Sequence, residues 1–484
     1  MKRISIFLLI LALFSACDNM LDEVPKDFVS RANYYTSQAD AEGAITGAYA
    51  TIDADYYGIN YYLMEELHGD YLDGRGSQAP ITVFDKVLDQ NSIGRVNSNW
   101  SNLYKGINRA NAVIANVPNI EDINTDVQSR ILAEAYFLRS AAYFNLVRNW
   151  GPVPIRLTES TDLSSLEAPR EPVDKVYEQI IEDALKAEQG LPESVGAQTG
   201  KASKWSAKML LAQVYLTLED WDNCAQKSEE VINSGKYSLV TISKPDDFYK
   251  IFASETNPED IMSVHHSETK TSQIPTFIHR GNTYPYNYSG TGYYAWLPIM
   301  NSFIGDSWDD NDLRKDFNLY TKYLNEAGDT VSLPESSPVL FKKFISNEDG
   351  LNVYSVPIYR YTEAFLMYAE AACMAEEGPT ALALERINMI KRRAYGYDPN
   401  SVSPVDYPAG MSQDEFRETV LQERAYEFIL ERRRWWDLNR THRVKEAFAA
   451  IGKTFIDERY LWPIPTDEIN NNPAINQEDQ NPGY

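Results

Sequence analysis

The spacing of apolar residues predicts helices over most of the chain. Apolar side chains recur every three or four residues over 40–53, 99–116, 126–150 and 173–189, and this is the period of an amphipathic α-helix. The segment 126–150 is apolar around most of its girth beyond its first turns, so we expect that helix to be buried. It should end at the Gly-Pro-Val-Pro sequence that follows, because proline cannot continue a helix.

Two helix hairpins are predicted further along the chain. The first joins 203–218 to 222–234, and the second joins 362–377 to a helix that continues to about residue 394. Both carry Ala and Leu where helices must approach closely, and both resemble tetratricopeptide hairpins. A later helix should begin after Ser412, because Ser412 and Glu415 fit a capping box. Its predicted buried face consists of Phe416, Val420, Leu421, Ala425, Phe428 and Ile429.

The helical period fails between residues 238 and 358. Gly, Pro, Ser and Thr gather there, with short β-branched pieces such as 353–358, which favours loops and a few short strands. We therefore predict a mainly α fold with a helical body over 38–237 and a loop-rich insert over 238–358. The C-terminal helices and an irregular tail over 359–484 should pack with 38–237 as one domain.

The N-terminus has the features of a secretory signal. Basic Lys2 and Arg3 precede an apolar run over 4–14. As a helix this run would be about 16 Å long, too short for the roughly 30 Å hydrocarbon core of a bilayer. A basic start, a short apolar stretch and small residues before a cut site are typical of a secreted protein.

Cys17 directly follows the small residues, and this makes the start resemble a bacterial lipoprotein signal. We then expect residues 1–16 to be the signal peptide, the Cys17 thiol to carry a lipid, and 17–37 to be a tether. The acidic residues after Cys17 resemble a surface-export tag. The alternative is a plain cleaved signal in which Cys17 is unused.

Charge and cysteine content exclude some functions. The net charge is −25, so the chain repels phosphate backbones and we expect no nucleic-acid partner. Three cysteines in 484 residues cannot form a disulfide scaffold. Cys224 and Cys373 lie in Ala- and Leu-rich sequence, where buried free thiols are expected.

Tyrosine is unusually abundant, with 32 residues, and it is clustered. Residues 56–62 contain four tyrosines, and 284–296 contains six aromatic residues together with Gly and Pro. Aromatic rings with a polar edge suit the flat C–H faces of sugars at low entropic cost. Trp308 is a weaker candidate, and the alternative is that the rings only pack the insert onto the helices. The candidate stacking residues are Trp296, Tyr293, Tyr294, Tyr284, Tyr286 and Tyr57.

Catalytic and metal-binding patterns are weak. Adjacent acids such as Glu65 and Glu66 are expected by chance among 70 acidic residues, although a glycosidase does need two carboxyl groups. Three acids lie close together at Asp309, Asp310 and Asp312, but the sequence around them lacks the loop of a calcium site. We expect no cofactor or metal. The basic run 432–434 should lie at a helix C-terminus, where its positive charge would interact favourably with the helix dipole. Three histidines lack the spacing of zinc ligands: His265, His266 and His279.

Four stretches together resemble the SusD/RagB-type nutrient-binding lipoproteins of Bacteroidetes. They are the start at Cys17, the segment 133–155, the pair 360–371 with 423–438, and the ending 461–484. The resemblance implies a helical body with four tetratricopeptide-like hairpins. It also implies a surface lipoprotein that lids a TonB-dependent, SusC-like outer-membrane transporter and captures an oligosaccharide, or a peptide in the RagB branch.

The same resemblance places the ligand between the loop after the first helices and the central insert. On that basis Asp70, Asp73 and Arg75 are candidate partners for sugar hydroxyls, and the alternative is a polar turn. Three functions remain open: a non-catalytic glycan- or peptide-binding protein, a cell-surface glycosidase, and a scaffold that binds only a partner protein.

Overall fold

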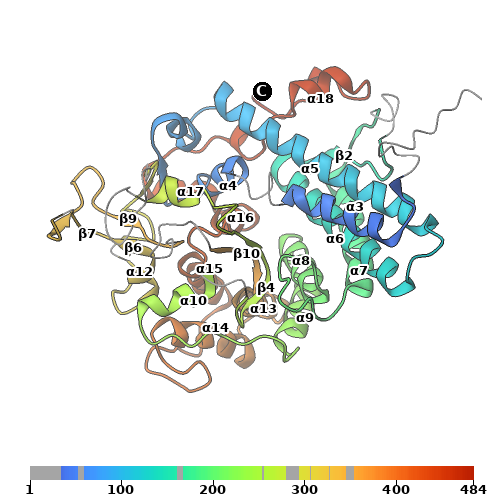
Figure 1. The fold of residues 1–484 in the computed structure, drawn as a ribbon. Coiled ribbons are helices and arrows are strands. Elements are labelled where there is room, and N and C mark those ends of the chain that lie inside the picture. Colours follow the sequence, from blue (N-terminus) through green and yellow to red (C-terminus); the bar gives the residue numbers. More distant parts are fainter. Residues whose placement is uncertain are drawn as a thin grey trace, which may run out of the picture.

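The computed structural model describes residues 34–52, 59–160, 167–252, 256–279, 294–305, 307–325, 327–344 and 354–484, and it is mainly α-helical (Figure 1). The α-helices are α3 (Gln38–Thr51), α4 (Ile59–Glu66), α5 (Gln90–Asn116), α6 (Thr125–Trp150), α7 (Val173–Gly190), α8 (Lys204–Thr217), α9 (Trp221–Ile232), α10 (Tyr249–Phe252), α11 (Ile274–Ile278), α12 (Leu313–Asn318), α13 (Tyr361–Ala375), α14 (Ala381–Ala394), α15 (Gln413–Glu427), α16 (Arg434–Arg440), α17 (Val444–Ala450) and α18 (Thr466–Asn471). The strands are β1 (Leu72–Gly74), β2 (Val153–Pro154), β3 (Arg170–Glu171), β4 (Asp260–His265), β5 (Trp296–Pro298), β6 (Leu319–Tyr320), β7 (Lys322–Leu324), β8 (Thr330–Ser332), β9 (Leu340–Phe341) and β10 (Ser355–Arg360), and those described pair only in twos.

Helix α6 lies at the centre of the N-terminal helices. It packs against α3, α5 and α7, which lie together on one side of the molecule in Figure 1. Because neighbours enclose it, most of its side chains after Ile131 are buried, as the sequence predicts. It ends at Gly151, whose φ of 71° lies in the left-handed region that glycine tolerates.

The predicted hairpins are confirmed. The first is α8 with α9 and the second is α13 with α14, each bounded within a few residues of the expected positions. Ser412 caps α15: its hydroxyl accepts from the Glu415 N–H, while the Glu415 carboxylate accepts from the Ser412 N–H. All six side chains predicted for the inner face of this region are buried.

Two helix boundaries differ from the prediction. Helix α5 begins at Gln90, nine residues early, because the Asp89 carboxylate caps it by accepting from the Ser92 N–H. Its first turns are rich in Asn and Ser, so the apolar period does not reveal them. Helix α15 ends at Glu427, so the basic run lies at the start of the next helix rather than at a helix C-terminus: Arg432 and Arg433 are in the connection and Arg434 begins α16. Positive φ angles at Leu430 and Arg432, near 58°, break the helix before the basic run.

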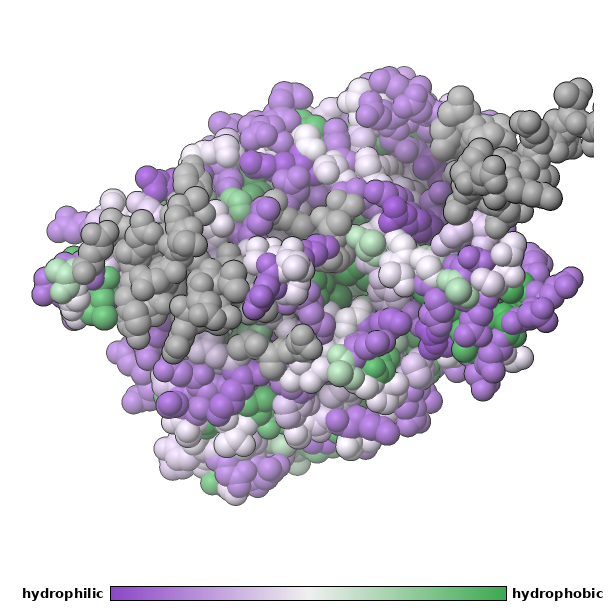
Figure 2. Space-filling view, in the orientation of Figure 1, coloured by the Kyte–Doolittle hydropathy of each residue, from purple (hydrophilic) through white to green (hydrophobic). Residues whose placement is uncertain are grey.

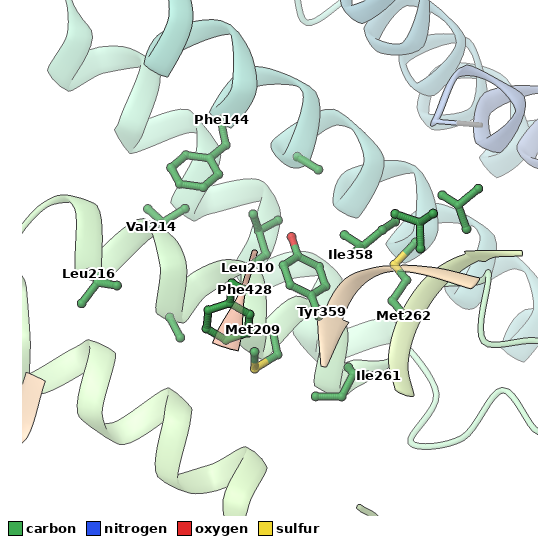
Figure 3. Close-up of a cluster of buried hydrophobic side chains, with 14 of the residues drawn as sticks. Phe144, Met209, Leu210, Val214, Leu216, Ile261, Met262, Ile358, Tyr359 and Phe428 are labelled. Atoms are coloured by element: carbon green, nitrogen blue, oxygen red, sulfur yellow. The ribbon is translucent and has the colours of Figure 1, made fainter. Parts of the chain in front are cut away.

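The insert joins the core through strands β4 and β10. They pair with each other, and β10 leads directly into α13. Figure 3 shows Ile261 and Met262 of β4 and Ile358 of β10 in one buried cluster with Leu210 of α8. The main core therefore contains side chains from the N-terminal body, the insert and the C-terminal helices.

Buried ion pairs fix the end of α15 to the last residue of β10 and to the insert. Arg360 donates to Glu427 at 2.6 Å and to Glu431 at 2.8 Å, and Arg314 donates to Glu423 at 2.7 Å. All of these side chains are almost fully buried. Because losing one partner would leave a buried charge uncompensated, this network holds the elements in one relative position.

The two cysteines in the described residues are buried free thiols, as predicted. Burial raises the pKa of Cys224 to about 12 and that of Cys373 to about 11. Neither thiol is ionised at neutral pH, so neither is reactive.

The described helices include none that is both long and apolar enough to cross a membrane. On the face drawn in Figure 2, hydrophilic residues dominate the visible surface, and hydrophobic ones appear as separate patches. This surface agrees with the strongly acidic composition.

Candidate ligand-binding site

A two-stranded ribbon brings two of the predicted site segments together. Strands β1 and β5 pair antiparallel, and Asp73 lies opposite Leu297. The Arg75 N–H extends the ladder by donating to the Ala295 carbonyl at 2.7 Å. A Cβ at Gly74 would lie 2.3 Å from a backbone oxygen of the following turn, so the ribbon requires glycine there. Residues around 70–75 and 294–298, far apart in sequence, are thus neighbours.

Arg75 and Tyr294 form a partly exposed pair at one end of this ribbon. The Arg75 guanidinium carbon lies 4.6 Å from the centre of the Tyr294 ring, which is a cation–π contact. Arg75 is exposed and Tyr294 is half-buried. The Tyr294 ring packs with Leu297 and Tyr323 on a small cluster beneath. The ring is therefore supported by the protein while part of it remains accessible.

Asp73 is half-exposed and forms an ion pair with Lys453. The Lys453 ammonium also donates to the Thr82 carbonyl. This pair ties the ribbon to the segment after α17 and leaves Asp73 with an accessible edge.

Trp296 is a core residue, and its expected role as an exposed stacking platform is corrected here. Its side chain has no exposed surface. The indole N–H donates to the Gln78 side-chain oxygen at 2.5 Å, and the ring stacks against Tyr62 and Phe277. Because its indole N–H is hydrogen-bonded and its ring packs against other rings, Trp296 supports the ribbon from the core side. Trp308 is likewise buried and donates to Asp312 at 3.0 Å.

Asp70 leads to a pocket that the sequence did not indicate. Its carboxylate accepts from Arg434 at 2.8 and 2.7 Å in a bidentate ion pair, and only 4% of the residue is exposed. This pair forms part of the wall of a pocket of about 360 Å³ between α15, α16, α17 and the loop after β5. We call it the α16–α17 pocket.

The α16–α17 pocket combines an apolar wall with a polar rim. Its charged lining residues comprise four acids and two arginines. The apolar residues are Phe303, Leu421, Leu438, Ala447, Ala450 and Ile451. The uncharged polar residues are Asn301, Ser302, Ser307, Gln422 and Thr441. The charged residues are Asp70, Glu418, Asp437, Glu446, Arg434 and Arg443.

The remaining predicted site residues lie outside the described residues. These are Tyr57, Tyr284, Tyr286 and Tyr293. Among the residues that the structure describes, no group of three or more His, Cys, Asp or Glu side chains is arranged to hold a metal ion.

Comparison with known proteins places the chain in a family. A model described as the SusD family matches residues 282–484, and a model described as starch-binding associating with outer membrane, also SusD-like, matches residues 21–216. The chain belongs to the SusD/RagB family.

Individual relatives match over nearly the whole chain. A SusD-like protein, P2, of Formosa agariphila is 28% identical over 519 residues, covering 100% of this chain and 99% of the relative. The crystal structure of a SusD homolog from Bacteroides thetaiotaomicron has a TM-score of 0.79 at 23% identity, covering 94% and 98% of the two chains. Surface glycan-binding protein A from Bacteroides fluxus has a TM-score of 0.73 at 23% identity, covering 93% and 100%.

Proposed function

We propose that the chain is a non-catalytic outer-membrane lipoprotein that captures an oligosaccharide or polysaccharide and delivers it to a TonB-dependent, SusC-like transporter. Family membership supports carbohydrate capture, since one matching family model is described as starch-binding and outer-membrane associated. The similar fold of a protein named as surface glycan-binding points the same way.

The observation that carries the proposal is the arrangement around the β1–β5 ribbon. Arg75 and Tyr294 stand at one end of the ribbon. At the other end, Asp70 before β1 and Asn301 after β5 line the α16–α17 pocket. Sugars need this combination, because their C–H faces pack on rings and apolar walls while their hydroxyls bond to charged and amide groups.

The dimensions favour a chain of sugars over a single one. Arg75 lies five positions after Asp70, and extended strand rises about 3.3 Å per residue, so the two ends lie up to roughly 16 Å apart along the strand. A ligand that contacts both must extend beyond one ring. Since acids outnumber arginines around the pocket, we propose a neutral glycan as the ligand.

The pairing of the carboxylates supports a non-catalytic role. Asp70 is held by Arg434, Glu418 is paired with Arg443, and Asp437 accepts from arginines behind the pocket. A glycosidase needs a protonated carboxyl group and a second free carboxylate across the scissile bond, whereas three of the four acids that line the pocket are held in ion pairs.

The membrane attachment is part of the proposal. Cys17 and the signal peptide 1–16 lie outside the described residues, and the sequence around them supports a lipid anchor and surface exposure. The tether over 17–37 would then leave the folded body free to meet its transporter.

Affinity gel electrophoresis tests the proposal. Protein lacking residues 1–17 is run through neutral and anionic polysaccharides, and released reducing ends are assayed in the same samples. We expect retardation by a neutral polymer without release. Retardation with release would establish the glycosidase instead, and binding of basic peptides alone would favour peptide capture by the acidic rim.

A matched pair of tyrosine variants tests the site. Tyr294→Ala should weaken glycan binding about tenfold, on the scale of one stacked ring. Tyr397→Ala removes an exposed tyrosine elsewhere on the chain and should leave binding unchanged. Equal binding by both variants would exclude the Arg75–Tyr294 end of the ribbon from the site.

A further inference from the structure

A second pocket lies on another side of α16. It is lined by residues of α4, α6, α8, β10, α13, α15 and α16 and has a volume of about 50 Å³. Phe144, Leu216, Ile358 and Tyr359, all labelled in Figure 3, belong to its apolar part together with Trp436. We call it the arginine pocket, because five guanidinium groups line it: Arg148, Arg424, Arg432, Arg433 and Arg440.

Four of these arginines are matched by carboxylates. The carboxylates also hold the guanidinium groups in fixed positions, so the pocket is preorganised for a ligand. The pairs are Arg424 with Asp437, Arg432 with Glu65, Arg433 with Glu363, and Arg440 with Glu370 and Asp437.

Arg148 is the exception. Within the described residues it forms no ion pair, and its guanidinium donates to the Asn145 side-chain oxygen at 2.7 Å. The Arg148 guanidinium carbon lies 3.9 Å from the centre of the Phe144 ring and 4.2 Å from that of Trp436. The two rings hold the cation in place without neutralising it.

Arg424 provides an independent sign of a missing partner. The residue is only 3% exposed, yet its Nη1 atom has no hydrogen-bond partner among the described residues. A buried charged N–H group without an acceptor is costly. An unpaired N–H group at a pocket wall is placed to donate a hydrogen bond to a bound ligand.

Charge and volume define what this acceptor can be. Three carboxylates line the pocket against five arginines, so it is locally positive in a chain of net charge −25. A water molecule needs about 10–15 Å³ of such volume. A pocket of about 50 Å³ therefore holds a few waters or one small polyatomic ion. Planar guanidinium groups bind oxyanions in preference to other anions.

We propose that the arginine pocket binds a small oxyanion, either inorganic phosphate or sulfate or the carboxylate of a small organic acid, between Arg148 and Arg424. The site is separate from the α16–α17 pocket and does not depend on glycan capture. The bound anion links α6, which carries Arg148, to α15, which carries Arg424.

Isothermal titration of the full-length protein, solubilised in detergent, tests this site. Sodium phosphate, sulfate and acetate are each titrated at constant ionic strength maintained with sodium chloride. We expect 1:1 binding of at least one oxyanion and a higher Tm in its presence. Binding of phosphate or sulfate would identify an inorganic ligand, and binding of acetate alone would identify a carboxylate. Heats and Tm values equal to those in chloride for all three would overturn the proposal.

Three variants locate the binding. Arg148→Gln should weaken the anion about tenfold, the scale of a charge-assisted hydrogen bond. Arg109→Gln is the matched control, because Arg109 also forms no ion pair in the described part of the chain and donates to a main-chain carbonyl. Thr217→Asp places a carboxylate at the pocket wall without removing an arginine, and it should weaken binding at least as much. Undiminished binding by a folded Arg148→Gln or Thr217→Asp protein would show that the anion lies elsewhere.

Discussion

The α16–α17 pocket and the arginine pocket share one short helix but differ in charge. Asp437 of α16 lines both, whereas Arg434 lines the larger pocket and Arg440 the smaller. The larger pocket has four acids and two arginines, and the smaller has three acids and five arginines. Two pockets of opposite charge balance can therefore lie back to back, and the net charge of −25 predicts neither.

Asp437 is the residue that keeps the two pockets apart. Although burial opposes ionisation, the guanidinium groups of Arg424 and Arg440 hold the pKa of Asp437 below its ordinary value. It accepts from Arg424 at 2.8 Å and from Arg440 at 2.8 and 3.0 Å. The ionised carboxylate thus fixes arginines on the side of the smaller pocket while it forms part of the wall of the larger.

The largest expected effect is that of Asp437→Ala, which breaks both pockets at once. Because it leaves two buried guanidinium groups without this partner, we expect a loss of about 3–5 kcal/mol in the free energy of unfolding. Urea denaturation measures the loss. Asp310→Ala, at a side chain that is 92% exposed, should change stability by less than about 0.5 kcal/mol. A loss below about 1 kcal/mol for Asp437→Ala would contradict the role given to this carboxylate.

The next effect concerns Glu66, the neighbour of the pocket residue Glu65 on α4. Burial raises the pKa of Glu66 to about 8, while its carboxylate accepts from the Arg432 N–H at 2.8 Å. The folded protein thus keeps a proton that the unfolded chain, with an ordinary pKa near 4.5, has released. The contribution of Glu66 to the free energy of unfolding therefore falls as pH rises from about 4.5 to about 8, by at most about 1.4 kcal/mol per pH unit.

Urea midpoints between pH 6.5 and 8.5 show this effect most clearly. Below pH 6.5, buried His68 and His279 act in the opposite direction, because burial lowers the pKa of each to about 3 and the unfolded chain then binds more protons. Glu66→Gln keeps the site neutral, so its stability should not show the Glu66 decline in this window. Parallel curves for the two proteins would show that Glu66 is ionised in the fold.

A smaller effect separates the two pockets. Ala447→Trp introduces an indole at the wall of the α16–α17 pocket and should weaken glycan binding about tenfold or more while leaving oxyanion binding intact. Ala449→Trp is the matched control, because Ala449 is exposed on the same helix and does not line the pocket. Loss of both ligands in Ala447→Trp would mean that the pockets are coupled.

The smallest effect is expected at the exposed end of the ribbon. Arg75→Gln removes a cation–π contact worth about 0.5–1 kcal/mol at an exposed site, so glycan affinity should fall about two- to fivefold. Arg109→Gln is again the control. Titration with the polymer identified in the gels measures both, and an Arg75→Gln affinity equal to that of Arg109→Gln would remove Arg75 from the site.

The helices could be predicted from the sequence where local signals are complete. Periodicity identified α6 and α13, and the Ser412 hydroxyl with the Glu415 carboxylate marked the start of α15. The first turns of α5 were not predicted because they are polar. The end of α15 was not predicted because left-handed backbone at Leu430 has no reliable sequence signal.

The site could be predicted only in part. Family resemblance pointed to the two segments that the ribbon joins, but it could not show that Trp296 is buried. That depends on Gln78 and Phe277, which are distant in sequence. The α16–α17 pocket draws on four separate segments. Glu418 and Gln422, four apart on α15, were a possible signal, yet polar pairs at this spacing are common on any exposed helix face.

The state of the two buried cysteines makes the protein convenient for chemical labelling. With thiols that are shielded and poorly ionised at neutral pH, a maleimide reagent should react with neither in the native fold. In a form lacking residues 1–17, Ser77→Cys would then be the single reactive position, at an exposed site just after β1. A fluorophore placed there would report ligand arrival in real time without any removal of native cysteines.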